Sequence, residues 1–240
     1  SRGNALNANT YEDDMNYLIT GSAGFIGSHL SEALIKKGHT VFGLDNMNQF
    51  YDPGLKQDNL VSIEKTAESS EGEFIFYKGD IRHQDEIEQI LRGDQIHTVI
   101  HLAAMAGVRP SLENPRLYYD INVSGTINVL EACKVAGVQN MVFASSSSVY
   151  GNQKKTPFSE TDIVDQPESP YAATKKAGEL TCALYKNLYD MRVAALRFFT
   201  VYGPRQRPDL AICKFAKLLE QGKKLSLIHI RAHETRPYLV

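Results

Sequence analysis

The sequence predicts an α/β protein with a doubly wound parallel sheet, and three observations lead to this prediction. Apolar strand-like runs alternate with helical runs through five successive units. The first unit turns from strand to helix on glycines spaced Gly-x-x-Gly-x-x-Gly, which is the context of a dinucleotide-binding turn. Several strand-like runs also end in small or polar residues, as expected where the carboxyl ends of parallel strands border a ligand.

Composition argues against several other classes of protein. The 240 residues are 42% hydrophobic, enough for a full core, and the formal net charge is −2. No block of Lys or Arg indicates a nucleic acid or an anionic membrane as a partner, no apolar run reaches the length of a membrane span, and no signal peptide is visible. The three cysteines are scattered, without metal-ligand spacing, as is typical of free thiols in a reducing cytoplasm. We therefore expect a cytoplasmic protein without a metal site.

The glycine turn is the first candidate site. Residues 17–20 form the expected first strand, and Gly21, Gly24 and Gly27 follow it. Gly21 permits the tight turn, Gly24 lets backbone N–H groups approach a pyrophosphate, and Gly27 lets the helix pack close to the strand. The positive end of the helix would then face the phosphates of the cofactor. The alternative is an ordinary strand–helix turn that binds no ligand. The residues assigned to cofactor contact here are Gly21, Gly24, Phe25, Ile26 and Gly27.

The next two expected strands, residues 40–45 and 74–78, each end near an acid. Asp45 lies about 20 positions beyond the glycines, where a ribose 2′-hydroxyl would be bound, and Asn46 follows it. NADP would need an arginine for its extra phosphate and this dipeptide offers none, so NAD is favoured; a carboxylate that caps a loop is the alternative. Asp80 and Ile81 would lie beside an adenine, unless Asp80 simply caps the next helix.

A buried fourth strand is expected over residues 98–104, and its small final residues leave room for a flat ligand. His101 within it is interpreted as a hydrogen-bonded core histidine rather than a catalyst. A long helix over residues 118–136 and a fifth strand over 141–144 follow. The residues assigned to cofactor contact here are Leu102, Ala103 and Ala104.

Tyr171 and Lys175 are four residues apart, so they share one face of the helix that is expected to reach Tyr189. A free tyrosine is a poor base at neutral pH, but a neighbouring ammonium and a positive nicotinamide ring would lower the phenol's pKa. A serine from the run after the fifth strand could share the substrate's proton, which suits oxidation of a carbinol to a ketone. Tyr-x-x-x-Lys alone is common by chance, whereas its combination with the glycine turn and the serine-rich end of the fifth strand is specific.

These stretches resemble the extended short-chain dehydrogenase/reductase family, in its NAD-dependent nucleotide-sugar epimerase/dehydratase branch, which has a Rossmann-type fold. The resemblance is carried by residues 20–27, 45–46, 79–81, 101–104, 145–151, 171–175 and 196–204. It implies that Ser146, Tyr171 and Lys175 are catalytic, and that Tyr171 and Lys175 also contact NAD. It further implies that Ser148 contributes a second polar side chain to the wall of the substrate site. It also implies a homodimer as an option, because family members often pair through the helix of Tyr171.

Three segments, 45–53, 106–109 and 202–209, most resemble UDP-glucuronate 4-epimerases. A sugar carboxylate needs fixed cations, and an arginine can bind it bidentately. The substrate-binding candidates, besides Ser148, are Arg109, Thr200 and Arg207. A surface or phosphate-facing arginine is the alternative for Arg207. Related dehydratases carry an Asp-Glu pair after the catalytic Ser/Thr, and related decarboxylases a glutamate at the place of Ser148; neither acid is present, which favours simple epimerisation.

The resemblance therefore implies NAD-dependent 4-epimerisation of UDP-glucuronate to UDP-galacturonate by transient oxidation at C4. A UDP-glucose or UDP-N-acetylhexosamine 4-epimerase and a catalytically silent NAD-binding fragment are the alternatives. The expected organisation is a disordered tail over 1–15, an NAD-binding Rossmann domain over 16–200, the start of a substrate-binding lobe over 201–225, and a segment unlike the family over 226–240, which resembles a translated adapter. Because this lobe would be incomplete, the chain is expected to retain NAD without turnover.

Overall fold

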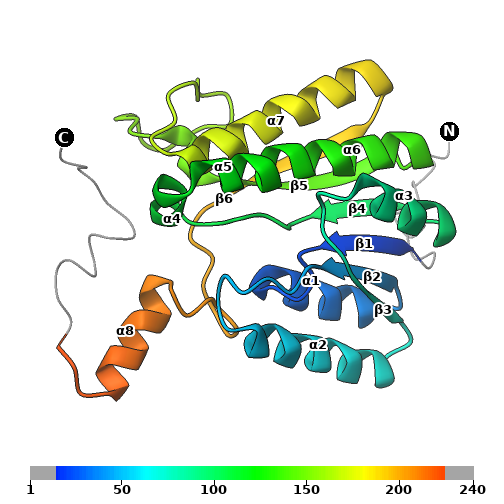
Figure 1. Cartoon of the computed structure of the whole chain (residues 1–240), viewed down its shortest axis with the longest axis horizontal. Coiled ribbons are helices and arrows are strands. Elements are labelled where there is room, and N and C mark those ends of the chain that lie inside the picture. Colours follow the sequence, from blue (N-terminus) through cyan, green and yellow to red (C-terminus); the bar gives the residue numbers. More distant parts are fainter. Residues whose placement is uncertain (1–14, 225–240) are drawn as a thin grey trace, which may run out of the picture.

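A central parallel sheet lies between two layers of helices in the computed structural model, which describes residues 15–224 (Figure 1). The strands are β1 (Asn16–Thr20), β2 (Thr40–Asp45), β3 (Phe74–Lys78), β4 (Thr98–His101), β5 (Asn140–Ser146) and β6 (Arg192–Phe198). They are hydrogen-bonded in the order β3-β2-β1-β4-β5-β6, and every neighbouring pair is parallel. The order reverses between β1 and β4, which confirms the predicted doubly wound sheet. Residues 1–14 and the predicted segment 226–240 lie outside the described residues.

Helices cover both faces of this sheet. The helices are α1 (Phe25–Ile35), α2 (Pro53–Glu68), α3 (Gln84–Gly93), α4 (Val108–Glu113), α5 (Pro115–Tyr119), α6 (Gly125–Ala136), α7 (Pro170–Tyr189) and α8 (Ala211–Glu220). Helices α1 and α2 pack against each other, and α3, α6 and α7 form a second packed group. This arrangement leaves open the end of the sheet at which all strands have their carboxyl termini.

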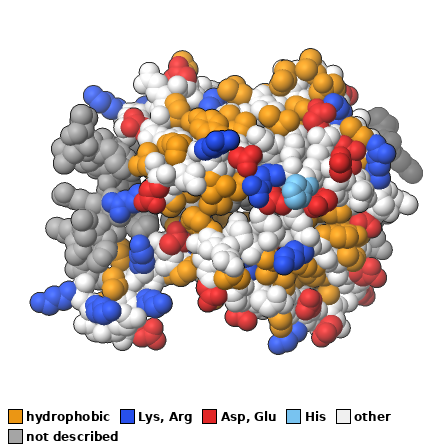
Figure 2. Space-filling view, in the orientation of Figure 1, with side chains coloured by type: hydrophobic (Ala, Val, Ile, Leu, Met, Phe, Trp, Pro, Cys, Tyr) orange, Lys and Arg blue, Asp and Glu red, His pale blue; other side chains and the backbone are white. Residues whose placement is uncertain are grey.

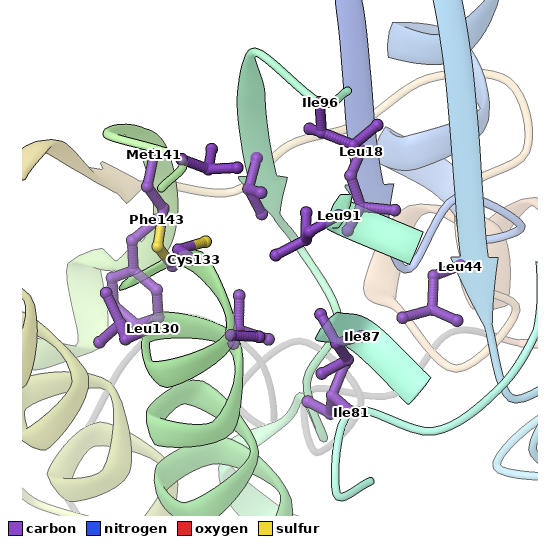
Figure 3. Close-up of a cluster of buried hydrophobic side chains, with 14 of the residues drawn as sticks. Leu18, Leu44, Ile81, Ile87, Leu91, Ile96, Leu130, Cys133, Met141 and Phe143 are labelled. Atoms are coloured by element: carbon purple, nitrogen blue, oxygen red, sulfur yellow. The ribbon is translucent and has the colours of Figure 1, made fainter. Parts of the chain in front are cut away.

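Each face of the sheet has its own hydrophobic core, because consecutive side chains of a strand point to opposite faces. Leu18 of β1 lies in the larger core with Leu91 of α3 and Phe143 of β5 (Figure 3). Its neighbour Ile19 packs in the other core, with Ile63 of α2. Burial on both faces explains why the central strands β1, β2, β4 and β5 appear in the sequence as continuous apolar runs.

Two of the predicted elements differ from the structure. The helix expected over 118–136 is divided: α5 ends at Tyr119, a π-helical turn spans Asp120–Ser124, and α6 follows. The strand expected over 98–104 ends at His101, so the last three residues form a loop along the open edge of the sheet. The sequence analysis also assigned no strand to Arg192–Phe198, which pairs with β5 as β6.

His101 is a hydrogen-bonded core histidine, as predicted from the sequence. It is 2% exposed, and its Nδ1 and Nε2 lie 2.7 Å from Thr20 Oγ1 and 3.0 Å from Thr126 Oγ1. The Thr126 hydroxyl donates to the Asn122 carbonyl and so accepts from His101, which assigns the proton to Nε2. Burial, together with the positive charge of Lys175, lowers the pKa of His101 to about 3.

Acid should therefore destabilise the fold through His101. In the unfolded chain this histidine binds a proton near pH 6.5, but in the folded chain only near pH 3, so the stabilisation is complete above about pH 6.5 and is lost as the pH falls. We expect the free energy of unfolding to decrease by about 1.4 kcal/mol per pH unit from this residue. Urea unfolding between about pH 7 and 4 measures the slope, and His101→Gln is the control; equal slopes in the two proteins would contradict this account.

Candidate active site

The carboxyl ends of the strands open into a cavity of about 380 Å³. Its lining includes residues at or just after the end of every strand, namely Gly21, Asp45, Gly79, Leu102, Ser146 and Phe199. The cavity thus lies at the reversal in strand order between β1 and β4, where ligands of open α/β sheets bind.

Most of the site residues predicted from the sequence line this one cavity. They are Gly21, Gly24, Phe25, Ile26, Gly27, Asp45, Asn46, Ile81, Leu102, Ala103, Ala104, Ser146, Tyr171, Lys175, Thr200 and Arg207. Three predicted residues, Asp80, Arg109 and Ser148, are not part of the lining. Arg109 is exposed on α4, and Ser148 accepts a hydrogen bond from Ser146 Oγ at 3.2 Å. Roles for these three side chains in ligand binding stay predictions.

The glycine turn forms a backbone cradle at one end of the cavity. Gly21 has φ +75°, and a Cβ there would lie 2.9 Å from Ala103 N; a Cβ on Gly27 would lie 2.2 Å from Gly21 O. Both distances are too short for any side chain, so the turn requires glycine. Within residues 15–224 no side chain caps the start of α1. The first N–H groups of this helix therefore keep their hydrogen-bonding capacity for a ligand, and the positive helix end suits a phosphate.

Asp45 and Asn46 lie at the end of β2 and are held by different partners. Asp45 Oδ1 accepts from Lys56 Nζ at 3.2 Å. Asn46 donates to Asp80 Oδ2 at 2.9 Å, and Arg82 donates to both carboxylate oxygens of Asp80. Burial raises the pKa of Asp80, but hydrogen bonds from Arg82 and Asn46 outweigh it and hold that pKa below its usual range. The N-cap of α3 is His83, so the alternative that Asp80 caps this helix is wrong.

Tyr171 and Lys175 point from α7 to the end of β5. The helix begins at Pro170 because Ser169 caps it, its Oγ accepting from Ala172 N at 3.1 Å. Tyr171 thus lies in the first turn and Lys175 one turn later, where its Nζ donates to Ala144 O at 2.8 Å. Close packing of α7 on β5 depends on Gly178, since a Cβ there would lie 2.4 Å from the Phe143 ring.

The electrostatics of this pair differ from the expectation. Burial raises the pKa of Tyr171 and outweighs hydrogen bonding with Ser146 and the positive charge of Arg207, both of which lower it. Burial lowers the pKa of Lys175 to about 8. The sequence analysis expected Lys175 to lower the pKa of Tyr171, whereas the cation that acts on this phenol is Arg207. The Lys175 ammonium instead donates to a backbone carbonyl, that of Ala144.

Arg207 is fixed in the cavity wall. Its side chain is 16% exposed, and its Nε and Nη2 donate to the two oxygens of Asp209 at 2.9 and 2.7 Å. Its guanidinium also lies 5.1 Å from the centre of the Phe50 ring. Of the alternatives from the sequence, a surface arginine is therefore wrong, whereas a phosphate-facing arginine stays open. Among residues 15–224, only Asp209 accepts from Arg207, so within this part of the chain Nη1 and one N–H of Nη2 keep donor capacity.

The chain matches the GDP-mannose 4,6 dehydratase family over residues 18–239. It belongs to this family. A UDP-glucuronate 4-epimerase of Thermodesulfobacterium geofontis is 46% identical to it over 211 residues, which are 88% of this chain and 64% of that protein. The resemblance to the epimerase/dehydratase branch is thus confirmed.

Two solved structures are similar to this member of the GDP-mannose 4,6 dehydratase family. The UDP-glucuronic acid 4-epimerase from Bacillus cereus, in complex with UDP-glucuronic acid and NAD, is 39% identical, with a TM-score of 0.79 over 87% of this chain and 64% of that one. The UDP-glucose 4-epimerase from Thermus thermophilus, in complex with NAD, is 34% identical, with a TM-score of 0.76 over 88% and 64%. The chain therefore spans just under two thirds of the length of these proteins.

Two groups in this family member had no place in the sequence analysis. Asn122, in the π-helical turn, accepts from Met105 N at 2.7 Å and donates to Met105 O and Thr174 Oγ1 at 2.9 and 3.1 Å. It thereby joins the loop after β4 to α7. The surrounding residues 118–128 alternate polar and apolar side chains, so no local signal distinguishes Asn122 from its polar neighbours.

The second group is an ion pair behind the catalytic candidates. Glu179 Oε1 accepts from Ser145 Oγ at 2.6 Å and from Arg197 Nε at 2.8 Å, and its Oε2 accepts from Arg197 Nη2 at 2.9 Å. Glu179 follows Lys175 by four residues and so continues the face of α7 that carries Tyr171. That spacing is the signal from which the sequence could have predicted it.

Surface charge, metal-ligating side chains and exposed apolar residues bear on the possible partners of this chain. Acidic and basic side chains are interspersed on the face shown in Figure 2. Among residues 15–224, no three His, Cys, Asp or Glu side chains gather as a metal site, and no helix combines the length and apolarity needed to span a bilayer. α7 exposes Leu180, Leu184 and Leu188 at a spacing of four. The homodimer stays a prediction.

Proposed function

We propose that the protein that carries this chain is an NAD-dependent 4-epimerase of a UDP-sugar, and that its sugar is glucuronate. The observation that carries this proposal is that Tyr171, Lys175, Ser146 and Arg207 line one cavity with the glycine turn. The relatives named above act as support, because 4-epimerases are among the most similar proteins.

The residues of the cavity fit NAD. The glycine cradle and the free N–H groups of α1 would hold the pyrophosphate, and Asp45 would accept from a ribose hydroxyl. Lys175 and Ser146 would lie at the nicotinamide end, by the end of β5. When bound, NAD would supply the hydride-transfer chemistry needed at C4 of the sugar.

Tyr171 moves the proton in this proposal. Its phenolate would take the proton of the 4-hydroxyl and return it after the 4-keto sugar has turned in the cavity. Arg207 and Ser146 both favour the phenolate, because each lowers the pKa of Tyr171 against the effect of burial. Lys175, anchored on Ala144 O, fixes the position of a positive charge one turn along the same helix.

The cofactor part can be tested on the chain as it stands. We expect the purified, folded chain to release NAD when it is denatured, and mass spectrometry of the released small molecules measures it. A chain that gives a folded circular-dichroism spectrum but neither retains nor binds NAD would contradict the proposal. Epimerisation itself is tested with UDP-glucuronate in the protein that carries the C-terminal part found in its relatives.

Arg207 distinguishes glucuronate from neutral sugars. Removal of its donors in Arg207→Ala should lower kcat/KM for UDP-glucuronate about 10- to 100-fold more than for UDP-glucose, the value of a charge-assisted hydrogen bond. The loss of its effect on the pKa of Tyr171 is shared by both sugars. The exposed arginine of α3, changed in Arg92→Ala, is the matched control. Equal losses on both sugars would instead favour the UDP-glucose or UDP-N-acetylhexosamine 4-epimerase.

A further inference from the structure

Phe50 is an aromatic side chain of the cavity wall that the proposed chemistry does not use. It lies in the irregular segment between β2 and α2, and it is partly buried against the larger core. The centre of its ring is 5.1 Å from the guanidinium of Arg207, which belongs to the segment after β6. A cation at this distance is attracted to the electron-rich face of an aromatic ring. Phe50 thus contacts the arginine to which the sugar carboxylate is assigned.

Arg207 needs such a contact because the chain around it is irregular. Residues 199–210 form neither helix nor strand, and a long side chain on such a segment loses rotamer freedom when a ligand orders it. Asp209 accepts from Nε and Nη2 and so fixes one edge of the guanidinium. The side chain of Asp209 is itself 40% exposed, so this ion pair alone does not hold the guanidinium against the cavity wall. The ring of Phe50 supplies the second support, on the face of the guanidinium.

Phe50 is in turn held by hydrogen bonds within its own segment. Its N–H donates to Asn48 Oδ1 at 3.2 Å, and the same oxygen accepts from Lys56 Nζ at 3.3 Å. The N–H of Asn48 donates to Asn46 Oδ1 at 3.0 Å. Turns in which an asparagine side chain accepts from the backbone two residues on constrain a loop without a helix or strand. The ring therefore stands on a constrained support.

We propose that Phe50 determines specificity for an acidic sugar by positioning Arg207, an inference that rests on the proposed function of this cavity. The ring and the Asp209 carboxylate order the guanidinium before the substrate binds. A sugar carboxylate then binds without the entropy cost of ordering the arginine, whereas a neutral hydroxymethyl group gains little from the same donors. Phe50 is a positioning residue, since it acts through Arg207.

The ratio of kcat/KM for UDP-glucuronate to kcat/KM for UDP-glucose tests this inference, in the protein that carries the C-terminal part found in its relatives. Phe50→Leu keeps an apolar side chain but removes the aromatic face. It should lower the ratio about 3- to 30-fold, the value of a cation–π contact, chiefly through a higher KM for UDP-glucuronate. Phe50→Tyr keeps the aromatic face and should hold the ratio within about twofold of the wild type. A general loss of folded enzyme lowers kcat for both sugars and cancels in the ratio.

The same substitution in the Arg207→Ala background is the matched control. Without a guanidinium to position, Phe50→Leu should leave the ratio within about twofold of that of Arg207→Ala alone. If Phe50→Leu does not fold by circular dichroism, Phe50→Met gives the same comparison with another apolar side chain that has no ring.

The possible results separate the two proposals. Where Arg207→Ala lowers the ratio but Phe50→Leu does not, or where Phe50→Leu lowers it equally with and without Arg207, this inference is overturned and the proposed function stays intact. A ratio that Arg207→Ala leaves unchanged overturns both this inference and glucuronate as the proposed sugar.

Discussion

Phenylalanine at position 171 should lower kcat for 4-epimerisation about 10²- to 10⁴-fold, the usual contribution of a positioned acid–base group. The substitution removes the hydroxyl and keeps the ring, which packs edge-to-face on Tyr118 at 6.3 Å between centroids. We therefore expect the fold to be unchanged and the affinity for NAD to fall far less than kcat. The measurement is kcat with UDP-glucuronate, in the protein that carries the C-terminal part found in its relatives.

Tyr118→Phe is the matched control for this loss. Tyr118 is also buried, contacts the same ring, and donates its hydroxyl to Ala106 O at 2.9 Å. The loss of this hydroxyl should cost stability of about 1 kcal/mol, with far less effect on kcat. If Tyr171→Phe kept full activity, or lost NAD binding together with activity, the acid–base role of Tyr171 would be wrong.

Leucine at position 179 should destabilise the fold by about 3 kcal/mol or more, because it leaves the Arg197 guanidinium without its carboxylate. The side chains of Glu179 and Arg197 are only 10% and 16% exposed. Burial raises the pKa of Glu179, but hydrogen bonds from Arg197 and Ser145 outweigh it and lower that pKa, so the acid is charged at neutral pH. Urea unfolding of the chain measures the loss.

The double variant Glu179→Leu/Arg197→Met separates a charge effect from a packing effect. Because it leaves no unpaired charge, it should recover much of the stability that Glu179→Leu loses. Glu179→Gln, which can still accept from Ser145, should fall between the two. Additive losses in the double variant would mean that the pair contributes through packing alone.

Much of the fold follows from local patterns. The strand β2 agrees with the predicted residues because a continuous apolar run is typical of a parallel strand buried on both faces. The strand β3 also agrees, because its run is rich in aromatic and β-branched residues, although it is only half-buried at the edge of the sheet. The start of α7 is readable because Ser-Pro is an N-cap followed by a favoured first residue. β6 was missed because most of its residues are exposed, and its pairing with β5 is a long-range contact that a local pattern does not show.

The residues that line the site were predictable from the sequence to a similar extent. The cavity contains most of the residues that the sequence motifs singled out, since each motif ends a strand or begins a helix at the same edge of the sheet. The partners of these residues were not predictable. Lys56 donates a hydrogen bond to Asp45 from the helix that follows β2, and Asp209 accepts from the guanidinium of Arg207. Both pairs depend on which side chains meet in the folded structure, which a local sequence pattern does not show. Arg109, chosen by motif, is exposed on α4.

Asn122 mechanically couples the loop after β4, which lines the cavity, to the helix that carries Tyr171. Its amide holds both polar backbone atoms of Met105, and it also holds Thr174, which lies between Tyr171 and Lys175. A ligand that restrains the loop after β4 will therefore slow hydrogen exchange in the first turns of α7, including amides on the side of the helix turned away from the ligand.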